Sequence, residues 1–214
     1  PIAAARCCER AGADSIVAHL REDRRHIQEK DIRVLRKIVA TRLNLEMALD
    51  ERILAIACSV RPDVATIVPE KRAEITTEGG LDVVKHFRRI KLAAAALKKV
   101  GIEVSLFIDP AAAQILKTKE SGVDMIELHT GAYALARTKR QVLRELTTLK
   151  EMTAFARKMG MTVNAGHGLK YDNVRAIARI PGIAELNIGH SIISRAVFVG
   201  LETAVREMIG RIKR

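Results

Sequence analysis

Apolar residues recur along the chain at two different spacings, and segments of the two kinds alternate. In the segment 31–40 the apolar positions follow the 3.6-residue period of a helix, at Ile32, Leu35, Ile38 and Val39. The same period, with glycine as a stop signal, predicts helices at residues 2–11, 31–40, 51–60, 83–100, 111–120, 141–159, 173–180, 191–199 and 201–212. Short β-rich runs predict strands at residues 15–20, 42–47, 64–69, 103–109, 125–130, 162–165 and 184–188. Residues 131–139 are expected to form a loop or a short extra helix.

The strict alternation of helices and strands predicts a parallel sheet with right-handed crossovers. We expect the strands to be apolar on both faces, as a sheet covered by helices requires. Seven strands are predicted and the chain opens in a helix, so the pattern indicates an α/β fold of the (β/α)8 TIM-barrel class without its first strand. We expect residues 1–214 to form a single, N-terminally incomplete barrel domain. An open doubly wound sheet of seven strands is the alternative.

Composition narrows the class of protein. The 214 residues are 48% hydrophobic and 29% charged, which is typical of a globular chain. No apolar run reaches the roughly 18 residues of a membrane span, and no signal peptide is visible, so a cytoplasmic location is expected. Cys7, Cys8 and Cys58 have no metal-binding spacing and are expected to be reduced.

The net charge of +12 indicates an anionic partner, which could be nucleic acid, a membrane surface or a phosphorylated substrate. Lysines and arginines are spread over the predicted helices. Aromatic residues make up only 3% and there is no Trp, so a base-stacking stripe is absent. A basic nucleic-acid-binding module is the alternative from a different class, but it leaves the polar residues at the strand ends unexplained.

Polar residues gather where predicted strands end. Residues two apart on a strand share a face, and parallel strands end on one side of the sheet, where α/β enzymes keep their sites. This rule pairs residues at three strand ends, namely His19 with Arg21, Asn44 with Glu46, and Glu127 with His129. We therefore expect them to share one mouth with His167 and His190.

The carboxylate Glu46 lies among apolar neighbours, where an unpaired charge is costly. It is interpreted as a general base whose pKa burial raises, with a structural ion pair to Arg21 or Arg42 as the alternative. His19 is interpreted as an acid–base group or, alternatively, as a hydrogen-bonded core histidine. The sequence leaves the roles of Glu127 and His129 open.

Two glycine turns close the last two strands. The first is Asn164-Ala165-Gly166-His167-Gly168 and the second is Asn187-Ile188-Gly189-His190. Such turns suit the phosphate site that barrels build after their last strands, because backbone can approach a ligand closely there. The loop Thr76-Thr77-Glu78-Gly79-Gly80 offers further hydroxyl and N–H groups. No spacing indicates a metal site or a nucleotide cofactor.

Taken together, these strings resemble the pyridoxine 5′-phosphate synthase family, which forms the ring in one route to vitamin B6. The matching stretches are HLREDRRH (19–26), NLEM (44–47), VPEKR (68–72), TTEGG (76–80), VSLFID (104–109), ELHTG (127–131), VNAGHG (163–168) and ELNIGH (185–190). They occur in order and with compatible spacing from Gly12 to the C-terminus.

The resemblance implies a (β/α)8 barrel that assembles as a homo-octamer. It implies condensation of 1-deoxy-D-xylulose 5-phosphate with 3-amino-2-oxopropyl phosphate to pyridoxine 5′-phosphate, inorganic phosphate and water, by acid–base chemistry. No metal, redox cofactor, nucleic acid or membrane is implied. The family's first strand, which carries further substrate contacts, has no counterpart in this sequence.

Residue roles also follow from the resemblance. The catalytic residues it implies are His19, Glu46 and His167. Contacts to the deoxyxylulose phosphate are implied for Arg21, His26 and Thr76, and contacts to the second substrate for Gly168, Gly189 and His190. The alternatives are another phosphate-binding barrel lyase or isomerase, and an inactive fragment of the synthase.

Overall fold

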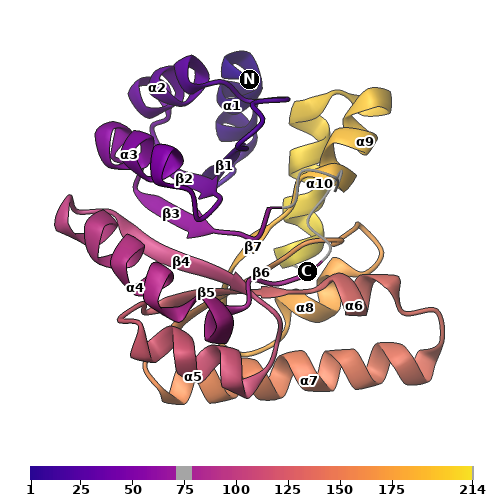
Figure 1. Cartoon of the computed structure of the whole chain (residues 1–214). Coiled ribbons are helices and arrows are strands. Elements are labelled where there is room, and N and C mark those ends of the chain that lie inside the picture. Colours follow the sequence, from indigo (N-terminus) through magenta and orange to yellow (C-terminus); the bar gives the residue numbers. More distant parts are fainter. Residues whose placement is uncertain (71–78, 214) are drawn as a thin grey trace.

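The computed structural model describes residues 1–70 and 79–213. Their strands form one parallel sheet in chain order. It comprises β1 (Ser15–Leu20), β2 (Arg42–Met47), β3 (Val64–Ile67), β4 (Glu103–Ile108), β5 (Met125–His129), β6 (Thr162–Gly166) and β7 (Ile183–Asn187). The sheet curls into an open barrel with helices around it, as Figure 1 shows. The predicted fold class, an α/β barrel with seven strands, is confirmed.

Helices alternate with the strands and pack on the outside of the sheet. They are α1 (Ile2–Ala11), α2 (Glu29–Ile38), α3 (Glu51–Val60), α4 (Val83–Lys99), α5 (Ala112–Glu120), α6 (Gly131–Leu135), α7 (Lys139–Lys158), α8 (Val174–Ala178), α9 (His190–Val199) and α10 (Leu201–Lys213). Their ends carry local signals: the Asp50 side chain accepts hydrogen bonds from the first turn of α3, Thr138 forms a capping box, and Gly12 ends α1 in the left-handed region.

The two faces of the sheet differ in polarity. The outward face packs on the helices with fully buried apolar residues such as Leu43, Leu45 and Met47. The inward face instead carries polar side chains, including Asn44, Thr66, Ser105, Glu127 and Asn164. The expectation of two apolar faces is therefore wrong. Only the helix-covered face must be apolar, because the inward side chains face the cavity and one another.

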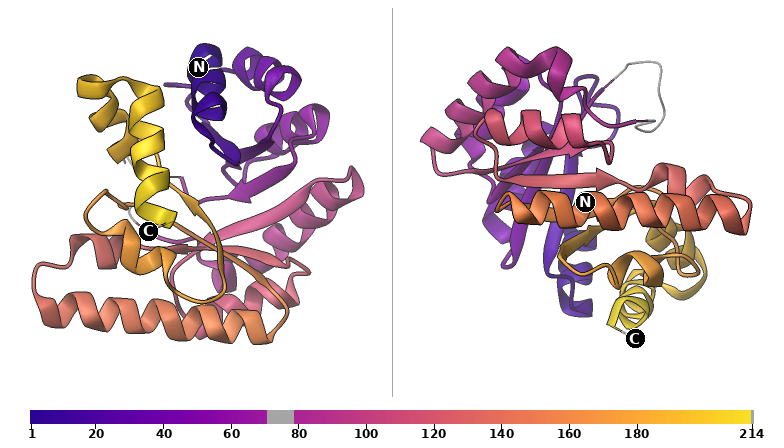
Figure 2. Two further views of the ribbon diagram at one scale, coloured as in Figure 1. Left: turned by 180° about the vertical axis from the view of Figure 1, so that it is seen from behind. Right: turned by 90° about the horizontal axis from the view of Figure 1, so that it is seen from below.

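The barrel is open between its first and last strands. In residues 1–70 and 79–213, β1 pairs with β2 alone and β7 with β6 alone. Helix α1 nevertheless contacts α10, so the outer layer of helices closes across this gap. The two views in Figure 2 show the N-terminal helix beside the C-terminal pair. A cavity of about 1580 Å³ runs from the mouth of the barrel into the gap.

Several element boundaries differ from the predicted ones by a few residues. Strand β3 ends at Ile67 rather than at residue 69, because Pro69 has no N–H to continue a ladder. The segment after β5 forms the short helix α6, which is one of the two expected outcomes. Among the helices of the described residues, none combines the length and hydrophobicity needed to cross a membrane.

Candidate active site

The site is built on the register of the first two strands. His19 of β1 lies opposite Glu46 of β2, at the carboxyl ends of both strands. His19 Nδ1 is 3.9 Å from Glu46 Oε2, and the two side chains are 21% and 24% exposed. Both line the cavity at the mouth of the barrel. The structure therefore brings His19 and Glu46 together at the mouth of the barrel, as expected from the sequence, and their catalytic roles stay predictions.

Burial sets the protonation of this pair. It raises the pKa of the Glu46 carboxyl to about 7, because the ionised form loses hydration. Burial, followed by the positive charge of Arg21, lowers the pKa of His19 to about 4. Near neutral pH the pair thus combines a carboxyl poised to gain or lose a proton with a neutral imidazole. Such a pair suits general acid–base chemistry.

The alternative interpretation of Glu46, a structural ion pair, is not supported. Arg42 pairs with Glu103 at 2.8 Å, at the other end of the barrel. Arg21 pairs with Asp23 and approaches Glu70. Within the part of the chain that the structure describes, neither of these two arginines forms an ion pair with Glu46. Its carboxyl group is therefore available for chemistry.

A second buried carboxyl group lies across the barrel from the first. Glu127 of β5 is 2% exposed, and the Asn187 side chain donates a 2.6 Å hydrogen bond to its Oε2. Burial raises the pKa of Glu127, and the negative charge of Glu46 raises it further. A Cβ atom on Gly166 would lie only 2.1 Å from Glu127 Oε1. Glycine at this position therefore makes room for the carboxyl group.

His129 has a partner that the sequence analysis did not single out. Its Nδ1 lies 3.0 Å from Asp109 Oδ1, and Asp109 also accepts a hydrogen bond from the backbone N–H of Gly80. The two-residue rule could have found Asp109, because it lies two residues beyond Phe107 on the inward face of β4.

The turn after β6 presents His167 in a strained backbone conformation. Its φ of +78° lies in the left-handed region, which a residue with a side chain rarely adopts. The Thr130 hydroxyl donates to the carbonyl oxygens of Gly166 and His167, which holds the turn in place. Burial, followed by the charges of His129 and His190, lowers the pKa of His167.

The second half of the expected site surrounds the same cavity. Gly168, Gly189, His190 and His26 line it together with His19, Arg21, Glu46, Glu127 and His167. Gly168 has a φ of +76°, and a Cβ there would be 2.6 Å from the Cβ of Ala134, so glycine is required. His190 is exposed at the start of α9. Thr76, another expected contact, lies outside the described residues.

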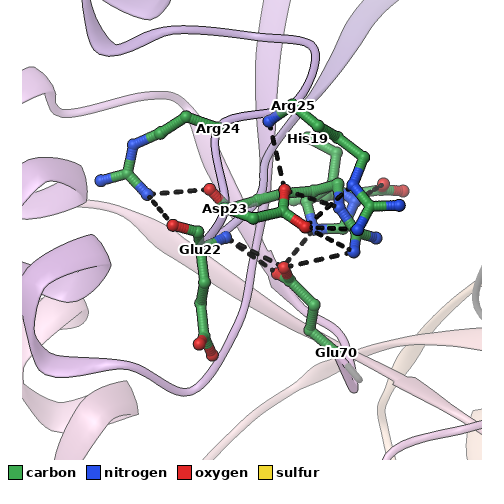
Figure 3. A network of polar contacts seen from close by, with 8 residues as sticks. His19, Glu22, Asp23, Arg24, Arg25 and Glu70 are labelled. Atoms are coloured by element: carbon green, nitrogen blue, oxygen red, sulfur yellow. Dashed lines mark hydrogen bonds and ion pairs between the residues drawn. The ribbon is translucent and has the colours of Figure 1, made fainter. Parts of the chain in front are cut away.

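The charged loop after β1 is organised by ion pairs (Figure 3). Arg21 donates to both carboxylate oxygens of Asp23 at 3.2 Å each, and Arg25 also binds Asp23. These two arginines hold the pKa of Asp23 well below its usual range. Arg24 pairs with Glu29 at 2.9 Å. The loop therefore places the Arg21 guanidinium, which is only 7% exposed, at the cavity.

A parallel barrel that gathers acid–base side chains and glycine turns at its strand ends is the architecture of an α/β-barrel enzyme. Comparison with known families identifies which family of barrel enzymes this is. The chain belongs to the family described as pyridoxal phosphate biosynthesis protein PdxJ, whose model matches residues 1–214. It is therefore a biosynthetic enzyme.

Relatives named pyridoxine 5′-phosphate synthase match the chain over nearly all of its length. The one from Trichlorobacter lovleyi is 52% identical over 214 residues, covering all of this chain and 90% of the relative. The one from a Synechococcus species is 57% identical over 208 residues, covering 97% of this chain and 87% of the relative. The family resemblance inferred from the motifs is confirmed.

Similar solved structures support the fold alone. KGPDC from Streptococcus mutans has a TM-score of 0.70 at 15% identity, covering all of this chain and 90% of that one. Phosphoribosyl anthranilate isomerase from Thermus thermophilus has a TM-score of 0.62 at 14% identity, covering all of this chain and 94% of that one.

Proposed function

We propose that the chain acts as a pyridoxine 5′-phosphate synthase, condensing 1-deoxy-D-xylulose 5-phosphate with 3-amino-2-oxopropyl phosphate. The observation that carries this proposal is the pair His19–Glu46, which faces a cavity also lined by Glu127 and His167. The names of the relatives support the same reaction. Ring closure releases inorganic phosphate and water, and it requires repeated proton transfers to and from carbon and oxygen.

The acid–base groups divide naturally between two sides of the cavity. Glu46 is the general base, because its raised pKa lets it take a proton from carbon and return it near neutral pH. His19, neutral at that pH, relays protons beside it. His167 comes from the turn after β6 and donates protons to leaving oxygen atoms. Each transfer contributes roughly 10²–10⁴-fold to the rate.

Two phosphate positions fit the remaining residues. Arg21 and His26, which line the cavity, bind the phosphate of the deoxyxylulose substrate, since a guanidinium fork matches phosphate oxygens. The family resemblance adds Thr76, which lies outside the described residues. Gly168, Gly189 and His190 bind the phosphate of the amino-oxopropyl substrate at the start of α9. The net charge of +12 raises the rate at which both anions meet the protein.

Product formation from the two substrates tests the proposal. Purified protein is incubated with both substrates, and pyridoxine 5′-phosphate is measured by mass spectrometry while phosphate is measured by a coupled assay. We expect product and phosphate in equal amounts, and neither when one substrate is omitted. Absence of product under conditions where the relative from Trichlorobacter lovleyi is active would contradict the proposal.

A further inference from the structure

A third buried carboxyl group, Glu70, approaches the His19 side chain from the side away from Glu46. It follows β3 by three residues, and its side chain is 1% exposed. Figure 3 shows it beneath the loop that follows β1. The function proposed above assigns it no role, although a buried carboxyl group must be paired or used.

The polar contacts of Glu70 within residues 1–70 and 79–213 are with groups that can donate a hydrogen bond. The backbone N–H of Glu22 donates to Oε1 at 3.0 Å and to Oε2 at 3.2 Å. Arg21 Nη2 lies 3.6 Å from Oε1. Burial raises the pKa of Glu70, while the Glu22 backbone N–H and the Arg21 guanidinium oppose that rise and favour the carboxylate form, which the Glu22 backbone holds in one orientation.

His19 lies between two carboxyl groups, one at each ring nitrogen. Its Nδ1 faces Glu46 Oε2 at 3.9 Å and its Nε2 faces Glu70 Oε2 at 3.5 Å. Nε2 is buried and has no hydrogen bond in the part of the chain that the structure describes. A proton on Nε2 would therefore face Glu70 and leave the Nδ1 lone pair facing Glu46.

We propose that Glu70 is a positioning residue that fixes the orientation of His19 and its Nε2–H tautomer. A carboxylate behind an imidazole selects which nitrogen carries the proton, and that choice decides whether the other nitrogen can accept one. With the proton on Nε2, the Nδ1 atom accepts a proton from Glu46 and returns it. The role of His19 in proton transfer rests on the proposed function, but the effect of Glu70 on the His19 tautomer does not depend on it.

Other charged groups around His19 define what the test must separate. The carboxyl groups are Glu46 on β2, Glu70 after β3 and Asp23 after β1, and the basic side chains are Arg21 and His26 after β1. If Glu70 served only to hold the loop through Glu22 and Arg21, its loss would lower stability without changing the proton position on His19. The decisive readout is therefore the His19 ring itself.

The variant is Glu70→Gln, which keeps the shape and one acceptor oxygen but removes the charge. Glu22→Gln is the matched control, because it removes an exposed charge from the same loop and keeps the Glu22 backbone N–H. The protein is labelled with ¹⁵N-histidine, and the His19 signal is assigned by its loss in His19→Gln. We expect Glu70→Gln to shift His19 toward the Nδ1–H tautomer and to lower its pKa, and Glu22→Gln to change neither.

Kinetics provide the second readout. Glu70→Gln is expected to lower kcat by about 10–100-fold, the range typical for the partner of a working histidine, while KM changes less than kcat. If Glu70→Gln does not fold, Glu70→Asp retracts the carboxylate by one methylene and is expected to produce the same change in tautomer. An unchanged His19 tautomer and pKa in a folded variant would overturn the proposal. If the unaltered protein makes no product, the proposed function fails, while the tautomer still tests Glu70.

Discussion

For single residues, the decisive effect is loss of hydration and not pairing with a cation. Glu46, Glu127 and Glu70 all have raised pKa values, and burial is the largest cause for each. Glu46 contacts an imidazole and Glu127 an amide, while Glu70 accepts from a backbone N–H and also lies 3.6 Å from the Arg21 guanidinium. Glu46 and Glu127, whose pKa values burial raises to about 7 and about 8, change protonation near neutral pH, which carboxylates locked to arginine do not.

Replacing Glu46 by Gln is expected to lower turnover by about 10²–10⁴-fold, because the amide cannot accept a proton from carbon. The fold should survive, since Gln has the same shape and neither Arg21 nor Arg42 pairs with Glu46. Turnover with both substrates and circular dichroism are the measurements. Glu103→Gln, an exposed change at the opposite end of the barrel, is the control. Near-normal turnover of the Glu46→Gln variant would remove Glu46 from the mechanism.

Glu127 is expected to make stability depend on pH. Its pKa rises from 4.5 to about 8 on folding, so between these values the folded state holds a proton that the unfolded state lacks. Its stabilising contribution is complete below pH 4.5 and is lost as pH rises through 8. Glu127→Gln should therefore gain stability relative to the unaltered protein as the pH rises from 5 to 8, by roughly 3–4 kcal/mol. Denaturant unfolding of both proteins at pH 5 and pH 8 measures the difference in their free energies of unfolding. The same difference at both pH values would contradict a raised pKa of the buried Glu127 carboxyl.

At the scale of elements, the pattern of predicted strands was enough to predict the fold and the position of the first two site residues. Strands β1 and β2 have the predicted bounds, and the rule that parallel strands end on one side of the sheet placed His19 and Glu46 together. The polar inward face was missed, because the sequence does not show which face of a strand the helices cover. Glu70 was missed because its position depends on the path of the chain after Pro69, where no periodicity applies.

The two glycine turns predict where an anion binds. Gly168 and Gly189 line one cavity, and Gly189 is the N-cap of α9, whose free N–H groups attract negative charge. Crystals grown with phosphate are expected to show an anion between these turns. The matched change is His190→Ala, which should weaken phosphate binding by about tenfold in calorimetry, as expected for a charge-assisted contact of about 1.4 kcal/mol. An anion bound elsewhere, with this position empty, would count against the assignment.

At the scale of the whole molecule, helix α9 is unusual in having no buried residue. Ile193, Val197 and Phe198 are 58%, 79% and 82% exposed, which is typical of a surface that another chain covers. We propose that this surface contributes to a homo-oligomer, in line with the octamer expected from the family resemblance. Phe198→Ser should shift the mass measured by light scattering toward smaller species. The control is Leu92→Ser, which replaces another exposed apolar side chain on α4 and should leave the mass unchanged. An unchanged mass in the Phe198→Ser variant as well would exclude α9 from the interface.

The open edge of the barrel bears on stability. Strands β1 and β7 each have one side without a strand partner in the described residues, and unpaired edges expose N–H and C=O groups. We therefore predict that an N-terminal extension that supplies a further strand increases both stability and activity. The thermal midpoint and the product formation of the 214-residue chain are compared with those of the extended protein. Equal values would show that the barrel does not need that strand.

The pairing of His19 with Glu46 continues to Thr66 on β3 as one row across three strands. Hydrogen bonds hold neighbouring strands about 4.8 Å apart, so the spacing of the side chains in this row is fixed by the sheet. Insertions and deletions in the surrounding loops leave this spacing unchanged. Deleting one residue inside β2 would instead turn Glu46 into the helix layer and Leu45 into the cavity. The reactive groups thus tolerate changes in chain length everywhere except within the strands that carry them.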